Sequence, residues 1–275
     1  MQKIYFLPII LLVLSSCNSI KIKELDIDAT QELIGKVKQM EVVTFRYPTD
    51  EKDTIIEKDS SVFYFDLKNK IVKEIDCYLK FKYETDFNYK NNLLESQVSK
   101  IRKRNRKVEY KYDKKSNVIE YNQLENDTLK FRKTSIYNKQ NNPLERTYFH
   151  PSYTSNNSIS KYSYDYKSRT INIQSFDENN LPSNHYLKYF FNKKGYIIKT
   201  ETIYTDSNKG YTRNSILEYD KLGNVTRIAG LDEDGKMQVI IEYKNICDEK
   251  GNIIIREKYW KKKLIEKRTF KITYR

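Results

Sequence analysis

Histidine is scarce in this sequence, and the shortage excludes much of enzyme chemistry. Only His150 and His185 are present among 275 residues, so near-neutral acid–base groups are few. Neither stands in a metalloprotease motif, a Cys/His metal spacing or a nucleophile elbow, and the chain has no Gly-rich nucleotide loop. Two carboxylates suffice for glycoside hydrolysis, and 37 acidic residues leave that alternative open. We expect no enzyme, no metal and no cofactor.

Glycine and proline are also rare, with seven and five residues, which argues against a flexible linker or a low-complexity tract. The mean hydropathy of −0.80 and the 32% of charged residues would suggest disorder. However, 24 Tyr and 12 Phe run through the whole chain, and aromatic residues favour strands. The composition therefore predicts one continuous folded unit that is rich in β-structure.

Cysteine occurs three times, and the three residues have different contexts. Cys17 follows a hydrophobic leader, whereas Cys77 and Cys247 lie in the body of the chain. In an oxidising compartment these two could form a disulfide. Cys77 falls on an apolar strand pattern and Cys247 takes an aromatic position in a repeat, so we favour two small buried side chains over the disulfide.

The N-terminus carries a short hydrophobic run. Lys3 is followed by apolar residues from Ile4 to Leu14, too few for a permanent helical span of about 20 residues but long enough for a signal peptide. The run leads directly into Leu14-Ser15-Ser16-Cys17.

This stretch resembles the lipobox of bacterial lipoproteins. The resemblance implies that residues 1–16 are removed and that Cys17 is acylated, with residues 17–32 as a lipidated tether. Because Asn18 is not the Asp that retains many such proteins in the inner membrane, we expect an outer-membrane anchor. Asn18 to Lys21 also lack the acidic cluster of some surface-exported lipoproteins, so we expect the anchored protein to face the periplasm.

A seven-residue motif recurs along the chain after the tether. The sequence Y-D-K-L-G-N-V from Tyr219 has nine relatives, at intervals of about 12 to 28 residues. The ten copies begin at Phe65, Phe87, Tyr112, Tyr137, Tyr164, Phe176, Phe191, Tyr219, Leu231 and Cys247. The second position is always Asp or Asn, and the fifth is Gly, Asn or Ser.

These residue types specify a tight turn. An Asp or Asn at the second position accepts hydrogen bonds from backbone amides, and the fifth position suits a residue with positive φ. Together they predict a type I turn with a G1 bulge, so that each copy is a hairpin tip. The turn residues that carry this prediction include Asp66, Asn69, Asp113, Asn192, Gly195, Asp220, Gly223, Asp232, Gly235, Asp248 and Gly251.

The motif resembles the YD, or RHS-type, repeat, over about residues 33–275. That resemblance implies a repetitive antiparallel hairpin or meander sheet, curved or partly closed, with roughly twenty short strands. In large RHS proteins such repeats form a shell around a toxin. This chain is too short to enclose a cargo, so the resemblance implies an architecture rather than a function.

The charge balance points to an anionic partner. The formal net charge is +14, which attracts polyanions, although basic residues also keep exposed sheets soluble. The densest run, Lys100 to Lys107, would place Lys100, Arg102, Arg104 and Arg106 on one face of a strand.

Two further features are candidates for ligand contact, with a core or solvated role as the alternative for each. Trp260 adjoins Lys261 to Lys263, and the segment from Thr147 to Lys161 departs from the repeat. The residues singled out in these features are Tyr148, His150, Tyr153 and Trp260.

These patterns favour a membrane-anchored, non-catalytic binding or scaffold module for an anionic envelope glycan or an acidic surface. The alternative is an interaction protein that neutralises or docks a protein such as a toxin. Because we expect export, nucleic acid is a poor candidate for the partner.

The lipobox interpretation makes a direct prediction. Cys17→Ser removes the thiol that would carry the lipid, so this variant should lose acylation and leave the membrane fraction. Metabolic labelling with a fatty acid, together with fractionation, measures both effects. A Cys77→Ser variant is the control and should keep the lipid. Membrane retention of Cys17→Ser would contradict the interpretation.

Overall fold

The computed structural model describes residues 20–23, 33–49, 56–78, 81–101, 104–153, 157–205, 214–232 and 234–275. The predicted signal peptide, Cys17 and Arg102 lie outside these ranges. The described residues form eighteen strands and contain no helix. The strands are β1 (Val37–Arg46), β2 (Glu57–Phe65), β3 (Ile71–Tyr78), β4 (Phe81–Lys90), β5 (Leu93–Ile101), β6 (Arg104–Tyr112), β7 (Val118–Glu125), β8 (Thr128–Tyr137), β9 (Pro143–Phe149), β10 (Ser158–Asp165), β11 (Thr170–Phe176), β12 (Pro182–Phe191), β13 (Ile197–Tyr204), β14 (Asn214–Tyr219), β15 (Val225–Leu231), β16 (Met237–Cys247), β17 (Ile253–Trp260) and β18 (Lys263–Tyr274).

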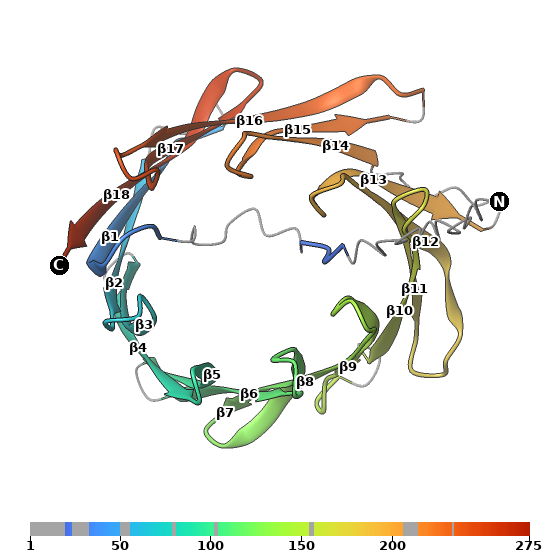
Figure 1. Cartoon of the computed structure of the whole chain (residues 1–275), viewed down its shortest axis with the longest axis horizontal. Helices are drawn as coiled ribbons and strands as arrows, with labels where there is room; N and C mark the ends of the chain where they lie inside the picture. The colour runs from blue at the N-terminus through green and yellow to red at the C-terminus, as the bar shows by residue number, and fades with distance from the viewer. Residues whose placement is uncertain are drawn as a thin grey trace, which may run out of the picture.

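The strands form one antiparallel meander that closes on itself. Each strand pairs with its neighbours in sequence, and β1 pairs with both β2 and β18. The closing register places Val42 opposite Phe270 and Met40 opposite Ile272. Viewed along the shortest axis of the molecule, the sheet is a ring (Figure 1). The prediction of an all-β repetitive meander is confirmed, and the closure is complete.

None of the described residues belongs to a helix long and apolar enough to cross a membrane.

Closure gives the sheet two rims with different hairpins. We call the end that joins each even strand to the next odd strand the repeat rim, and the opposite end the loop rim. All eight hairpins of the repeat rim come from copies of the motif. The copies that begin at Phe176 and Leu231 form tips on the loop rim, between β11 and β12 and between β15 and β16. Copies of the motif that are 12 to 16 residues apart are therefore separated by one strand, and copies that are farther apart are separated by two.

Eight of the ten copies have the turn geometry that the sequence predicts. At the first of them, the Asp66 side chain accepts hydrogen bonds from the backbone N–H groups of Lys68 and Lys70, at 2.8 and 2.9 Å. Asn69 has a φ of 60° and Gly223, in a later copy, a φ of 90°. Each of these eight hairpins also has a register shift beside the turn, which is the irregularity that a G1 bulge produces.

The other two copies depart from the prediction. The copy at Phe87 forms a two-residue turn, in which both Asn91 and Asn92 have positive φ and Asn88 remains within β4. Two adjacent Asn residues suit this tighter turn. The copy at Tyr164 turns one residue later, with Arg169 rather than Ser168 at positive φ.

Tyrosines of the motif connect successive repeats. The Tyr112 hydroxyl donates to the carbonyl of Leu94 at 2.8 Å, and Tyr137 donates to Val118 at 2.9 Å. Tyr164 and Tyr219 make the same bond to Pro143 and Ile197, both at 2.6 Å. Each hydroxyl reaches the beginning of the odd strand one repeat earlier, which explains why the motif often begins with Tyr.

The core consists of two clusters on the face turned to the inside of the ring, which we call the inner face. One contains Val37, Met40, Phe63 and Phe65, with Leu33 packed against it. The other contains Ile171, Phe191, Ile197 and Leu217, with Ile20 and Ile22 packed against it. The opposite, outer face carries exposed ion pairs such as Lys107–Glu109 and Lys111–Glu120, with N···O distances of 2.6 and 2.9 Å.

Both described cysteines have free thiols. Cys77 is exposed, so the expectation of a small buried side chain is wrong at this position, because that stretch of β3 presents the thiol to solvent. Cys247 is half-buried, and burial raises the pKa of its thiol.

Substitutions at two glycines of the motif should distinguish the energetic cost of a positive φ from that of a steric clash. Gly223 and Gly235 have φ values of 90° and 76°, so alanine at either costs about 1–2 kcal/mol. A Cβ at Gly223 would also lie 2.6 Å from Cζ of Tyr196, whereas a Cβ at Gly235 has nothing within 4 Å. Thermal unfolding should therefore show a larger loss for Gly223→Ala than for Gly235→Ala. Unchanged melting temperatures would contradict the turn assignment.

Candidate functional site

All the described residues that the sequence proposed for ligand contact lie at or near the loop rim. Lys100 lies near the end of β5, while Arg104 and Arg106 begin β6. The segment with His150 and Tyr153 connects β9 to β10, and Trp260 ends β17. These strands occupy separate parts of the ring (Figure 1), so the residues share a rim without forming one site.

The predicted basic ladder on a single strand is wrong. β5 ends at Ile101 and β6 begins at Arg104, so a hairpin interrupts the run. Ile101 pairs with Arg104 and Lys100 with Asn105. Paired residues share a face, so Lys100 projects from the face opposite to Arg104. Arg104 also forms an ion pair with Glu125, with an N···O distance of 3.2 Å.

Tyr148 and His150 pack against an aromatic side chain. The ring centroid of Phe131 lies 6.3 Å from that of Tyr148 and 4.8 Å from that of His150. In contrast, Tyr153 is 67% exposed. Of these three predicted contact residues, Tyr153 is the one that presents its ring to solvent.

Trp260 is half-buried, and the ammonium of Lys261 lies 5.0 Å from its ring centroid. Its strand pairing places it opposite Ile241 and Lys263. The neighbouring lysine covers part of the indole, so the ring is not a fully open stacking platform.

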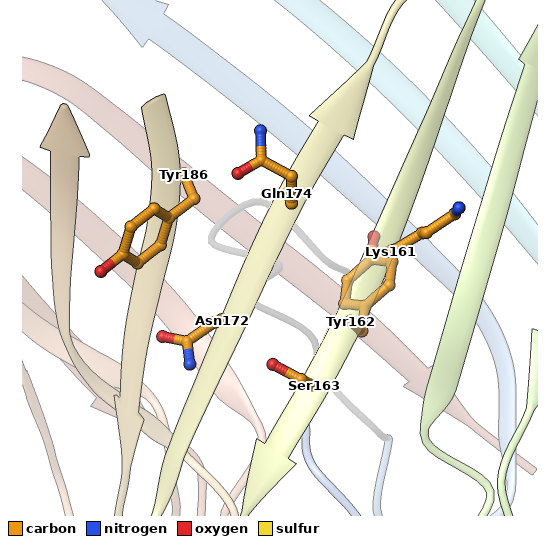
Figure 2. A pocket seen from close by; sticks show the side chains of 6 residues that line it. All are labelled: Lys161, Tyr162, Ser163, Asn172, Gln174 and Tyr186. Atoms are coloured by element: carbon orange, nitrogen blue, oxygen red, sulfur yellow. The ribbon is translucent and has the colours of Figure 1, made fainter. Parts of the chain in front are cut away.

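A shallow, open pocket of about 300 Å³ lies on the outer face of β10, β11 and β12, next to the segment that departs from the repeat, and we call it the polar pocket after the residue types that line it. Figure 2 shows its six lining side chains. Strand pairing places Lys161 opposite Gln174, Gln174 opposite Tyr186, and Ser163 opposite Asn172. The register therefore brings an ammonium, two carboxamides, a hydroxyl and a phenol to one face, with Tyr162 as the sixth lining residue.

Contacts within this pocket fix some of its groups. The ammonium of Lys161 lies 4.7 Å from the ring centroid of Phe176. The Gln174 amide donates to the carbonyls of Ser183 at 3.0 Å and His185 at 3.3 Å, which holds its side chain in place. None of the lining residues is acidic. In the sequence, these residues appear only as two alternating pairs, Lys161-x-Ser163 and Asn172-x-Gln174. Most of them are uncharged, so sequence reasoning did not select them.

A second cavity, of about 230 Å³, lies on the inner face beneath the N-terminal segment. Ile22 and Lys23 cover it, and Tyr162, Tyr164 and Ile173 are among its walls. Burial raises the pKa of Tyr162 to about 12, so its hydroxyl stays protonated at neutral pH. The cavity is occluded by the chain's own segment and is a weaker candidate for a ligand.

Two buried asparagines bind two separate stretches before β1, residues 20–22 and Ile34, at the repeat rim. Asn142 accepts from the N–H of Ile22 at 2.8 Å and donates to the carbonyl of Ile20 at 2.9 Å. Asn252 makes the equivalent pair of bonds with Ile34, at 2.6 and 2.9 Å. Both carboxamides are 0% exposed and occupy the sixth position of the motif. Sequence reasoning gave this position no role, although Asn recurs there.

Among the described residues, no three His, Cys, Asp or Glu side chains form a group that could hold a metal ion.

No family model matches this chain, and no curated protein matches it either. Solved structures with a similar arrangement include a porin-like protein from Bacteroides uniformis, with a TM-score of 0.45, 8% identity and coverage of 88% of this chain and 99% of that one. A porin-like protein from Bacteroides vulgatus has a TM-score of 0.28 at 11% identity and covers 87% and 99% of the two chains.

A third match is a Photorhabdus luminescens Tc holotoxin pore, with a TM-score of 0.29 and 10% identity. The alignment covers 78% of this chain and 15% of that one.

An inner-face carboxylate makes stability depend on pH. Burial, with a smaller effect of Asp76, raises the pKa of Glu74 to about 7 from 4.5. The folded state therefore holds a proton that the unfolded state releases above pH 4.5, so stability should fall as the pH rises from about 4.5 to about 7. Melting temperatures across this range should show the decline in the wild type and a smaller decline in Glu74→Gln. Identical slopes would contradict the assignment.

Proposed function

We propose that the protein is an exported, lipid-anchored module of the cell envelope that binds acidic glycans without chemical turnover. Acylated Cys17 would anchor it in the outer membrane, on the periplasmic side. The polar pocket on β10–β12 would bind the sugar.

The observation that carries this proposal is the set of donors in that pocket. Lys161 can pair with a carboxylate or sulfate, while Ser163, Asn172 and Gln174 offer the hydroxyl and amide groups that bind sugar hydroxyls. Tyr186 adds an aromatic surface. Glycoside hydrolysis needs two carboxylates, and the lining of the pocket has none.

The charge of the whole chain supports an acidic ligand. A formal net charge of +14 raises the local concentration of polyanions near the surface. This attraction is not specific to one site, so the pocket has to supply the recognition.

A protein partner is the second candidate, and the loop rim next to the pocket favours it. Tyr153 is 67% exposed and Leu181 is 61% exposed, in neighbouring loops between β9 and β10 and between β11 and β12. Exposed aromatic and apolar side chains of this kind mark protein contacts. A toxin or another protein with an acidic surface would fit this rim.

The proposal predicts a local effect of single substitutions. Calorimetric titration with an oligogalacturonate, as an acidic probe glycan, should show about tenfold weaker binding for Lys161→Ala, because a hydrogen bond to a charged group contributes about 1.5–3 kcal/mol. Asn172→Ala should also weaken binding. A neutral oligosaccharide of equal length should bind poorly to every form.

Lys244→Ala is the matched control. Its ammonium lies 4.7 Å from the ring centroid of Tyr259, the same distance as that between Lys161 and Phe176, but on β16. The control should bind the probe like the wild type. Equal losses in both lysine variants would show binding by overall charge and would contradict the pocket.

A further inference from the structure

The repeat rim carries a ring of exposed lysines. Each of its eight hairpins has Lys at the third or fourth position of the motif, and all of these lysines are exposed: Lys68, Lys90, Lys114, Lys115, Lys139, Lys167, Lys193, Lys194, Lys221 and Lys250. Because every hairpin of this rim comes from a copy of the motif, the lysines recur around the whole circumference. Solubility alone does not require a lysine at the third or fourth position of every one of these turns.

The aspartates of these hairpins accept hydrogen bonds within their own turns, and Glu249 is one exposed acidic residue outside that pattern. Asp113 accepts from the backbone N–H groups of Lys115 and Asn117, at 2.8 and 2.9 Å. The Asn117 carboxamide also donates to Asp113, and this bond together with the two backbone bonds lowers the pKa of Asp113. The equivalent Asp66, Asp165, Asp220 and Asp248 each accept two backbone N–H bonds as well. The carboxylates therefore turn back toward the backbone, and the lysines extend beyond them.

The described hairpins of the loop rim have a different charge. Outside the second position of the motif, Asp127, Glu178 and Asp234 lie in three of them. Basic groups such as Arg104 and Lys261 lie in others. The positive charge at that rim is therefore mixed with negative charge, whereas every tip of the repeat rim adds lysine.

The first described residues, 20–23, are bound at the repeat rim. Ile20 and Ile22 are bound to Asn142 of the β8–β9 hairpin, and the N–H of Lys23 donates to the carbonyl of Gly195, in the β12–β13 hairpin, at 2.9 Å. Cys17 precedes Ile20 by three residues, a reach of at most about 11 Å. An acyl group on Cys17 would therefore lie close to the lysine ring.

From this geometry we infer that the repeat rim faces the lipid bilayer and that its lysine ring binds acidic phospholipid headgroups, with the loop rim directed away from the membrane. The orientation rests on the proposed acylation of Cys17, but headgroup binding by the lysines does not. Acidic headgroups attract lysines within a Debye length, about 8–10 Å. Leu67, 78% exposed, and Leu222, 55% exposed, add apolar contact at two tips.

Vesicle binding tests the lysine ring without the lipid. The mature chain with Cys17→Ser should sediment with vesicles of phosphatidylcholine and phosphatidylglycerol, and not with phosphatidylcholine alone, and added salt should release it. Substituting Lys114, Lys115, Lys193 and Lys194 by Gln should weaken this binding about tenfold or more. Circular dichroism checks that each variant is folded.

The matched control removes four charges from the loop rim, through Lys100→Gln, Arg104→Gln, Arg106→Gln and Lys263→Gln. It should sediment like the parent protein. Equal losses in the two quadruple variants, or no binding to acidic vesicles, would overturn the inference. So would a repeat-rim variant that loses binding to a soluble polyanion such as heparin but keeps vesicle binding.

The single tryptophan measures the orientation of the lipidated protein. Trp260 lies at the loop rim, so brominated lipids should not quench its fluorescence. In a Trp260→Phe, Leu222→Trp variant, the tryptophan lies at the repeat rim and should be quenched. Quenching of Trp260 alone would overturn the inference while leaving acylation intact. Absence of acylation, with vesicle binding retained, would instead contradict only the anchor.

Discussion

The side-chain oxygen at the second position of the repeated motif is the constraint on which the rest of this structure depends. In the copy at Tyr219, Oδ1 of Asp220 accepts from the N–H groups of Leu222 and Asn224, both at 2.9 Å. This bond pair fixes a five-residue tip and lets Gly223 take a positive φ. Because the same turn recurs in six of the eight hairpins of the repeat rim, it aligns that rim of the ring. The tyrosine hydroxyls, the buried asparagines and the exposed lysines all take their positions from that alignment.

Much of this fold could be predicted from the sequence because the turns are local. Asp66 and Asn69, or Asp248 and Gly251, lie within a few residues of each other, and their chemistry determines the backbone between them. The strands then follow, since an aromatic residue precedes eight of the ten turns and apolar residues follow most of them. The prediction failed at Phe87, where two adjacent Asn residues form a two-residue turn, and at Tyr164, where the positive φ falls one residue later, at Arg169.

The remaining features depend on contacts between distant residues. Closure pairs β1 with β18, more than 200 residues apart, and no local pattern encodes that pairing. The opposite faces of Lys100 and Arg104 follow from the pairing of Ile101 with Arg104, which no turn motif in the sequence indicates. The pocket that includes Lys161, Asn172 and Tyr186 exists because the register of three strands places them together. Asn142 and Asn252 belong to the motif and can be found in the sequence. Their hydrogen-bond partners, the backbone groups of residues 20–22 and Ile34, lie more than 100 residues away and cannot.

A disulfide across the closing strand pair tests the central claim, a closed ring, most directly. Val43 and Thr269 are paired between β1 and β18, and paired Cα atoms lie about 4.5–5.5 Å apart, within the range that a disulfide spans. The chain with Val43→Cys and Thr269→Cys, and with its own three cysteines replaced by serine, should oxidise to an intramolecular disulfide in the folded state. Free thiols, or disulfides only between chains, would show that β1 and β18 do not meet and would contradict the account.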